Sequence, residues 1–139
     1  MQAIQEPKDL TLEERIALTR IIINLLDKWG FDNAAQVSVL ALPEGTPPRK
    51  INSYRSMNEP LPDTPEVWTR IEHILGIADA LRTTFPRNPQ AGLLWMRRPN
   101  KHLRRAPMAC MLEDGVSGLI RVRTHLDCTY AWDMSGSKP

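Results

Sequence analysis

The sequence predicts an all-α protein. Apolar residues recur three and four positions apart over residues 12–29 and again over residues 65–85, as on one face of an amphipathic helix. Threonine, aspartate or asparagine precedes several of these segments, and glycine or proline ends them, which are the signals that begin and stop helices. The same signals recur at short intervals over residues 88–126, so we expect a run of short helices there.

The most secure predicted element is a helix over residues 12–29. A capping box marks its start, because the hydroxyl of Thr11 and the carboxylate of Glu14 can each bind the other's backbone amide. Gly30 supplies the C-terminal stop. The helix is apolar around more than half of its circumference, so we expect the domain core on one side and a dimer surface on the other.

Two shorter helices are expected next, joined by a turn that contains proline. Asp32 is placed to cap a helix over residues 33–40. A turn follows at residues 43–47, and Pro48 can open a helix over residues 49–57.

A long helix is predicted after this pair. Three prolines within residues 58–65 forbid a continuous helix there, and the long helix runs from Pro65 through Phe85. Its apolar positions form one stripe, made of Val67, Ile71, Ile74, Ala78, Leu81 and Phe85.

Three short helices are predicted in the last third of the chain. Asn88 can cap one that runs to about residue 98, Pro107 can open a second that stops at Gly115, and Ser117 can cap a third that runs to about residue 126. Isolated helices of fewer than about 12–15 residues are marginal in water, so these three need mutual packing or a partner. The residues available for packing are Leu93, Leu94, Trp95, Leu103, Met108, Met111, Leu112, Leu119, Val122 and Leu126.

Length and composition bound the class of protein. A chain of 139 residues with 42% hydrophobic residues has room for one domain or two small ones. No apolar run approaches the roughly 18 residues of a membrane span, and the N-terminus lacks the form of a signal peptide, so we expect a cytoplasmic protein that does not enter a membrane. Cys110 and Cys128 are then expected to be reduced rather than paired.

The charge is distributed unevenly. Residues 1–80 hold eight Lys/Arg against twelve Asp/Glu, a net of −4, whereas residues 81–139 hold ten against four, a net of +6. Together they give the total of +2. This division suggests different partners for the two halves, and a solvated basic face is the competing explanation.

The helix over residues 49–57 is the candidate DNA-reading element, because in a helix-turn-helix the second helix of the pair lies in the major groove. The segment around it is net acidic, whereas clustered Lys/Arg is the main source of DNA affinity. The alternative is a helical bundle that serves as a dimerisation platform. The candidate DNA-binding residues are Arg49, Lys50, Asn52, Ser53 and Arg55.

No sequence signature indicates an enzyme or a cofactor. The chain has no glycine-rich phosphate loop, and His73 is best explained as a partly buried structural histidine. His102, Cys110, His125 and Cys128 could in principle hold zinc, but their spacing matches none of the usual paired-ligand sites. We therefore expect neither catalysis nor a metal.

Two features near the C-terminus remain to be explained. Six basic side chains, histidine included, fall within nine residues, which is consistent with a nucleic-acid patch or with a plain solvated face. Large side chains then alternate with small or polar ones near the end of the chain, and they either fold back on the C-terminal helices or contact a partner. The members of these two features are Arg97, Arg98, Lys101, His102, Arg104, Arg105, Tyr130, Trp132 and Met134.

One series of residues in this region carries a resemblance to a known family. The series in order is Ala91, Trp95, Pro99, Asn100, Leu103, Pro107, Leu112, Gly118, Val122 and Leu126. It resembles the C-terminal toxin-binding domain of the bacterial Xre/MbcA/ParS antitoxins. The chain departs from that pattern at residues 104–106, where the family more usually has glycine before the proline.

The resemblance implies a type II antitoxin whose two domains divide after residue 86. Residues 1–86 would form an Xre-like helix-turn-helix or dimerisation domain, and residues 87–139 the toxin-binding domain. The implied partner is a toxin, often a RES-domain enzyme that destroys NAD, and operator DNA would serve autorepression. The basic side chains would meet an acidic flank of the toxin. Our own hypothesis for the end of the chain is that Tyr130, Trp132 and Met134 lie across the active site of the toxin. The rival function is a stand-alone helix-turn-helix transcriptional regulator.

Overall fold

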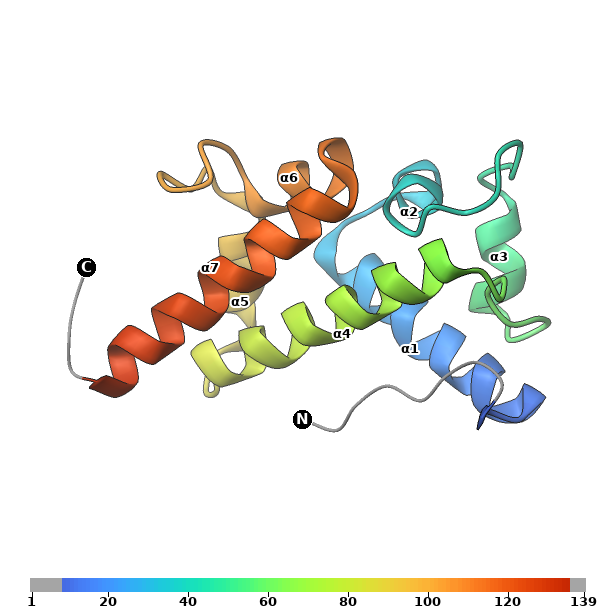
Figure 1. Cartoon of the computed structure of the whole chain (residues 1–139), viewed down its shortest axis with the longest axis horizontal. Coiled ribbons are helices and arrows are strands. Elements are labelled where there is room, and N and C mark those ends of the chain that lie inside the picture. The colour runs from blue at the N-terminus through green and yellow to red at the C-terminus, as the bar shows by residue number, and fades with distance from the viewer. Residues whose placement is uncertain (1–8, 136–139) are drawn as a thin grey trace. The chain divides into compact units, whose positions relative to one another are not determined.

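The computed structural model describes residues 9–135, and their side chains through residue 128. Within this range the chain is all-α, as predicted, and Asn100 and Arg105 form a single isolated β-bridge. The helices are α1 (Leu12–Trp29), α2 (Asn33–Val39), α3 (Lys50–Arg55), α4 (Pro65–Thr84), α5 (Pro89–Arg97), α6 (Pro107–Glu113) and α7 (Gly115–Ser135) (Figure 1).

The predicted caps of α1 and α5 are confirmed. Thr11 and Glu14 form the reciprocal capping box, and Gly30 ends α1 with a left-handed φ of 96°. Asn88 caps α5 through its side chain, which accepts from the amide of Ala91 at 3.3 Å. These boundaries could be read from the sequence because capping involves residues only three or four positions apart.

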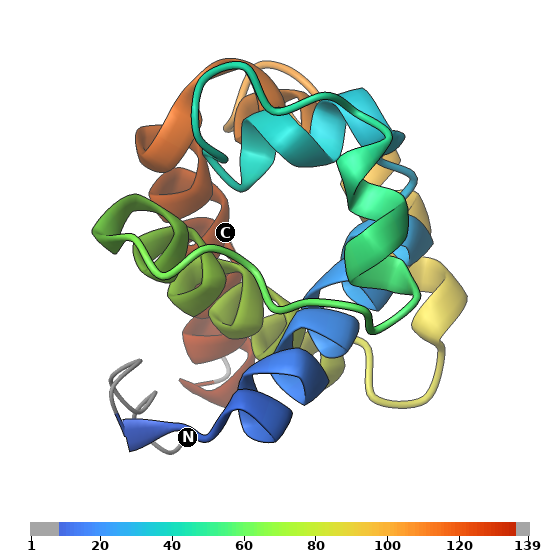
Figure 2. The same ribbon diagram turned by 90° about the vertical axis from the view of Figure 1, so that its right-hand side faces the viewer.

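The chain forms two compact units, and the boundary between them falls within α4, after Glu72. In the first unit α3 packs against both α1 and α2 (Figure 2). Its core includes Ile22, Leu26 and Ile51, each without exposed surface. The predicted domain boundary after residue 86 stays a prediction, and α4 is continuous up to Thr84.

In the second unit α6 packs closely on α7, and α5 packs on α6 (Figure 1). Leu103, Met111, Leu119, Val122 and Leu126 are buried as expected. The expectation was wrong for Leu94 and Leu112, which are 48% and 39% exposed. The core instead takes Met96 and Cys110, neither of which has exposed surface.

The junction between α6 and α7 differs from the prediction. Gly115 has a φ of 63° and turns the chain so sharply that α7 begins at once, without the intervening loop. Ser117 is therefore not an N-cap, and its hydroxyl instead donates to the carbonyl of Asp114 at 2.8 Å. The helix also continues to Ser135, well beyond the predicted end near residue 126.

Among the described residues, no helix is both long and apolar enough to cross a membrane.

Candidate functional site

The basic segment, residues 97–105, runs from the last residue of α5 into a loop that Asn100 organises. The backbone carbonyl of Asn100 accepts from the amide of Arg104 at 2.7 Å, and its own amide donates to the carbonyl of Arg105 at 3.1 Å. Its side-chain oxygen accepts from the amides of His102 and Leu103 at 2.9 and 3.1 Å. One asparagine therefore makes four of the hydrogen bonds that hold the backbone of this turn.

Arg105 differs from the other predicted toxin contacts, because its charge is engaged inside the domain. Its guanidinium binds the carboxylate of Glu113 at 2.6 Å and also that of Asp114. Arg121 binds the same Asp114 carboxylate at 3.1 Å. The hydrogen bond with Asp114 holds the pKa of Arg105 above its usual value. Arg105 thus ties the loop to the junction between α6 and α7.

The remaining cations of the basic segment face solvent. Arg97, Arg98, Lys101 and Arg104 are all exposed, and the described part of the chain offers none of them a salt bridge. Arg104 has a φ of 67°. Arg104 is the first of the three residues, 104–106, at which the sequence departs from the family pattern. It adopts a left-handed backbone conformation although it is not glycine.

Three aromatic rings hold the loop against α7. The ring centroids of Trp95 and His125 are 6.0 Å apart with an interplanar angle of 10°, and His102 lies 5.4 Å from His125. The side-chain amide of Asn100 donates to Nε2 of His125 at 3.4 Å. Burial lowers the pKa of His125, and the nearby His102 lowers it further. Trp95 is half-buried in this stack.

Beside the stack is a shallow, largely apolar hollow of about 390 Å³. Ile120 lies in it with 44% of its surface exposed, off the buried stripe of α7. Ile120 was not among the binding residues predicted from the sequence. An isoleucine on the polar face of an amphipathic helix could have indicated it, because exposed apolar side chains often mark binding surfaces. The full lining is His102, Leu103, Ile120, Arg121, Thr124, His125 and Cys128.

The predicted contacts Tyr130, Trp132 and Met134 lie in the last turns of α7, and their side chains fall outside the described residues.

The second candidate surface is α3. Arg55 makes a two-point pair with Asp27 of α1, at 3.0 Å from Nε and 2.9 Å from a terminal nitrogen. It also donates to the side-chain oxygens of Asn52 and Asn33 at 2.8 and 3.0 Å. The hydrogen bond with Arg55 lowers the pKa of Asp27. Gln36 completes the network by donating to Asp27 at 2.6 Å.

This network changes what α3 can offer to DNA. Arg55 and Asn52 are engaged in joining α3 to α1 and α2, and Lys50 pairs with Glu59 at 2.9 Å. Of the five candidate DNA-binding residues, Arg49 and Ser53 have no such partner within the described residues.

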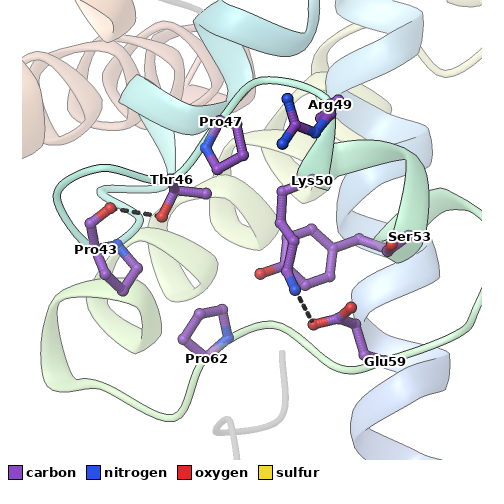
Figure 3. Close-up of a pocket in the computed structure, with 9 residues that line it drawn as sticks. Pro43, Thr46, Pro47, Arg49, Lys50, Ser53, Glu59 and Pro62 are labelled. Atoms are coloured by element: carbon purple, nitrogen blue, oxygen red, sulfur yellow. Dashed lines mark hydrogen bonds and ion pairs between the residues drawn. The ribbon is translucent and has the colours of Figure 1, made fainter.

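Arg49 and Ser53 border a second hollow, of about 620 Å³. Figure 3 shows Pro43 and Thr46 across the opening from Lys50 and Glu59. The hollow is lined by Pro43, Thr46, Pro47, Arg49, Lys50, Ser53, Tyr54, Glu59 and Pro62.

The described residues contain no group of three potential metal ligands. Cys110 is buried, with its sulfur 3.9 Å from the carbonyl oxygen of Leu103, whereas Cys128 is exposed.

The second unit presents the features of a binding domain: a set of exposed cations, an adjacent apolar hollow and a loop fixed by its own hydrogen bonds.

The comparison with known families identifies this domain. Residues 80–129 match the model of the antitoxin Xre/MbcA/ParS C-terminal toxin-binding domain. Residues 80–129 are therefore similar to the toxin-binding domain of this antitoxin family, and such a domain implies a cognate toxin as its partner. The matched range includes the basic segment, the aromatic stack and the hollow around Ile120. No curated protein matches the chain.

Proposed function

We propose that the protein is a type II antitoxin that binds a RES-type, NAD-degrading toxin and blocks its active site without being an enzyme itself. The observation that supports this most strongly is the match of residues 80–129 to the toxin-binding domain. The basic segment and the hollow lie together within that range, and they supply the two kinds of contact that a tight complex needs.

The exposed cations and the apolar side chains have different roles in this proposal. Arg97, Arg98, Lys101 and Arg104 attract an acidic flank of the toxin, which mainly accelerates association and sets the orientation. Affinity comes from apolar anchors that become buried. Ile120, which is 44% exposed beside the hollow, is the anchor that the described side chains favour.

The test is a pull-down of the tagged full-length chain from its host, washed with nuclease and high salt. We expect one co-retained protein that arrests growth when expressed alone and lowers cellular NAD. Ile120→Asp should abolish retention at every salt concentration. Arg98→Glu should weaken it mainly by slowing association. Gln90→Glu, on an exposed part of α5 away from the hollow, is the matched surface control.

Recovery of the bait alone would contradict the antitoxin proposal. If a fragment of the protein's own promoter were retained at low salt instead, the stand-alone transcriptional regulator would be favoured. DNA binding falls steeply with salt, whereas a protein complex with an apolar centre survives it.

We propose autorepression as a second activity of a homodimer. In each chain Arg49 and Ser53 would make the first DNA contacts, because Asn52 and Arg55 are held by hydrogen bonds within the unit and Lys50 is paired with Glu59 until an anion displaces that carboxylate. A dimer presents two such helices, which compensates for the few free cations in each. The exposed Ile21 of α1, at 51%, is the candidate centre of the dimer surface.

A further inference from the structure

The hollow of about 620 Å³ in the first unit is formed by three parts of the chain. The turn before α3 contributes Pro43, Thr46 and Pro47, α3 contributes its first turns, and the segment after α3 contributes Glu59 and Pro62 (Figure 3). Its volume is within the range of pockets that take small organic ligands, about 300–1,000 Å³. The hollow lies entirely outside the range matched by the toxin-binding domain.

Hydrogen-bond donors predominate among the polar groups of this lining. Arg49 supplies a planar guanidinium with no ion pair among the described residues, and Lys50 supplies an ammonium group. Ser53 and Tyr54 add two hydroxyls. The hydroxyl of Tyr54 is protonated at neutral pH, as is usual for tyrosine, and burial raises its pKa further, so it is able to donate. A guanidinium, an ammonium and hydroxyls together suit the several acceptor oxygens of a phosphate group.

The lining of the hollow also contains one carboxylate, that of Glu59. Glu59 binds Nζ of Lys50 at 2.9 Å, and the side chains of the pair are 36% and 40% exposed. An ion pair so accessible to water is weak, so an incoming anion can replace the carboxylate at low cost. With Arg49 and Lys50 opposed by Glu59 alone, the lining has a formal charge of +1.

The walls add an apolar component. Pro43, Pro47 and Pro62 line the hollow with rigid rings that donate no backbone hydrogen bond. Such walls favour a ligand that has an uncharged ring system as well as its anionic group. Inorganic phosphate alone would leave most of the volume unfilled.

We propose that this hollow binds a nucleotide phosphate, either in a free mononucleotide or in one residue of a DNA strand, and that the ligand displaces Glu59 from Lys50. The phosphate lies between Arg49 and Lys50 and accepts from the hydroxyls of Ser53 and Tyr54. The sugar and base lie against the proline walls.

The test is isothermal titration of the full-length chain with adenosine monophosphate, and with adenosine as the uncharged comparison. We expect the monophosphate to bind at least tenfold more tightly than adenosine. Glu59→Gln should tighten monophosphate binding about threefold to tenfold, because it removes the competing anion. Arg49→Ala should weaken binding about tenfold, the loss expected for one charge-assisted contact. Arg20→Ala, an exposed arginine of α1 outside the hollow, should leave binding unchanged.

A short duplex DNA of arbitrary sequence distinguishes the two sources of the phosphate. Binding of the duplex but not of the monophosphate, with the same dependence on Glu59 and Arg49, would place a strand phosphate in the hollow. Equal binding of adenosine and its monophosphate would overturn the proposal, as would indifference of both ligands to Glu59→Gln and Arg49→Ala in variants with unchanged circular dichroism. Since toxin capture uses the other unit, failure here leaves the antitoxin proposal intact.

Discussion

Individual polar residues decide which of the chain's many cations are free to act. Asp114 binds Arg105 and Arg121, and Asp27 binds Arg55 through two nitrogens. Arginine suits these positions because its planar group carries several donors, which bind one carboxylate at two points in the Arg55–Asp27 pair and two different carboxylates at Arg105. Arg97, Arg98, Lys101 and Arg104 in the second unit and Arg49 in the first are among the cations that stay exposed, without an ion pair to the described residues.

Replacement of Arg104 by glycine should stabilise the second unit. Arg104 has a φ of 67°, where a residue with a side chain is strained and glycine is not. Glycine also has greater conformational freedom in the unfolded chain, which offsets part of this stabilisation. We therefore expect a net increase of about 0.5 kcal/mol in the free energy of unfolding. Denaturant unfolding measures it.

Arg104→Ala is the matched control, because it removes the same charge and keeps the strained backbone. If Arg104→Gly and Arg104→Ala were equally stable, the left-handed turn would not be the source of the effect.

The free energy of unfolding should fall as the pH is lowered from 7 to 5, because of His125. Burial lowers the pKa of His125 in the folded chain below the usual 6.5, so the unfolded chain takes up the proton first. The contribution of His125 is complete above about pH 6.5 and is lost as the pH falls toward the folded value. Unfolding by denaturant at several pH values measures the slope.

His125→Phe keeps a ring against Trp95 and cannot titrate. The slope between pH 7 and 5 should therefore decrease in this variant. An unchanged slope would show that other groups cause the pH dependence. The lowered pKa of Asp27 acts in a separate range, because stability from a depressed carboxyl is lost only as the pH falls below about 4.

At the scale of helices, the packing of α6 on α7 depends on one glycine. A Cβ on Gly118 would overlap the carbonyl oxygen of Cys110 and lie 2.7 Å from its carbonyl carbon. Both contacts are with backbone, which cannot rotate away. This close approach explains why α7 can follow α6 with only a sharp turn at Gly115 between them.

Gly118→Ala should therefore lower the free energy of unfolding by about 3 kcal/mol, the upper end of the usual cost of overpacking. Gly92→Ala in α5 is the matched control, because its Cβ would meet Phe85 and Leu81 at 3.5 and 3.7 Å, which are ordinary contacts. Thermal unfolding followed by circular dichroism compares the two. Equal stability of both variants would contradict the role of Gly118.

The sequence predicted helices best where their signals are local. The capping box at Thr11 and the cap at Asn88 lie beside the helices that they begin, and both are confirmed. Ser117 carried the same kind of signal, but it lies inside α7, because the turn at Gly115 left no room for a separate cap. A capping residue is only a candidate until the packing of its neighbours is known.

At the scale of the whole molecule, the charge separates into an acidic first part and a basic second part, −4 over residues 1–80 and +6 over residues 81–139. Nearly all of the match to the antitoxin domain, residues 80–129, lies in the basic part, as the proposed attraction to an acidic flank of the toxin requires. The predicted contacts of Tyr130, Trp132 and Met134 with the toxin stay a prediction.

Truncation after Asp127 tests the tail. The buried residues Leu119, Val122 and Leu126 remain in the shortened chain, so its helical content per residue and its cooperative unfolding should persist. Protection of cells against the toxin should be lost, because the proposed occluding side chains are gone. Tyr130→Ala with Trp132→Ala in the full-length chain is the milder comparison. Full protection by the truncated chain would show that occlusion does not need the tail.

The sequence by itself determined the all-α class, the order of the helices and the resemblance to the antitoxin domain. The class and the helix order follow from apolar periodicity and capping residues, which are local signals. The resemblance follows from the order of particular residues along the chain. The tertiary structure alone decided that Arg55 and Arg105 are engaged and that Ile120 borders a hollow. Asp27 and Arg55 are 28 positions apart, and His125 is 25 from Asn100. No local pattern encodes such pairings, because they form only when distant segments fold together.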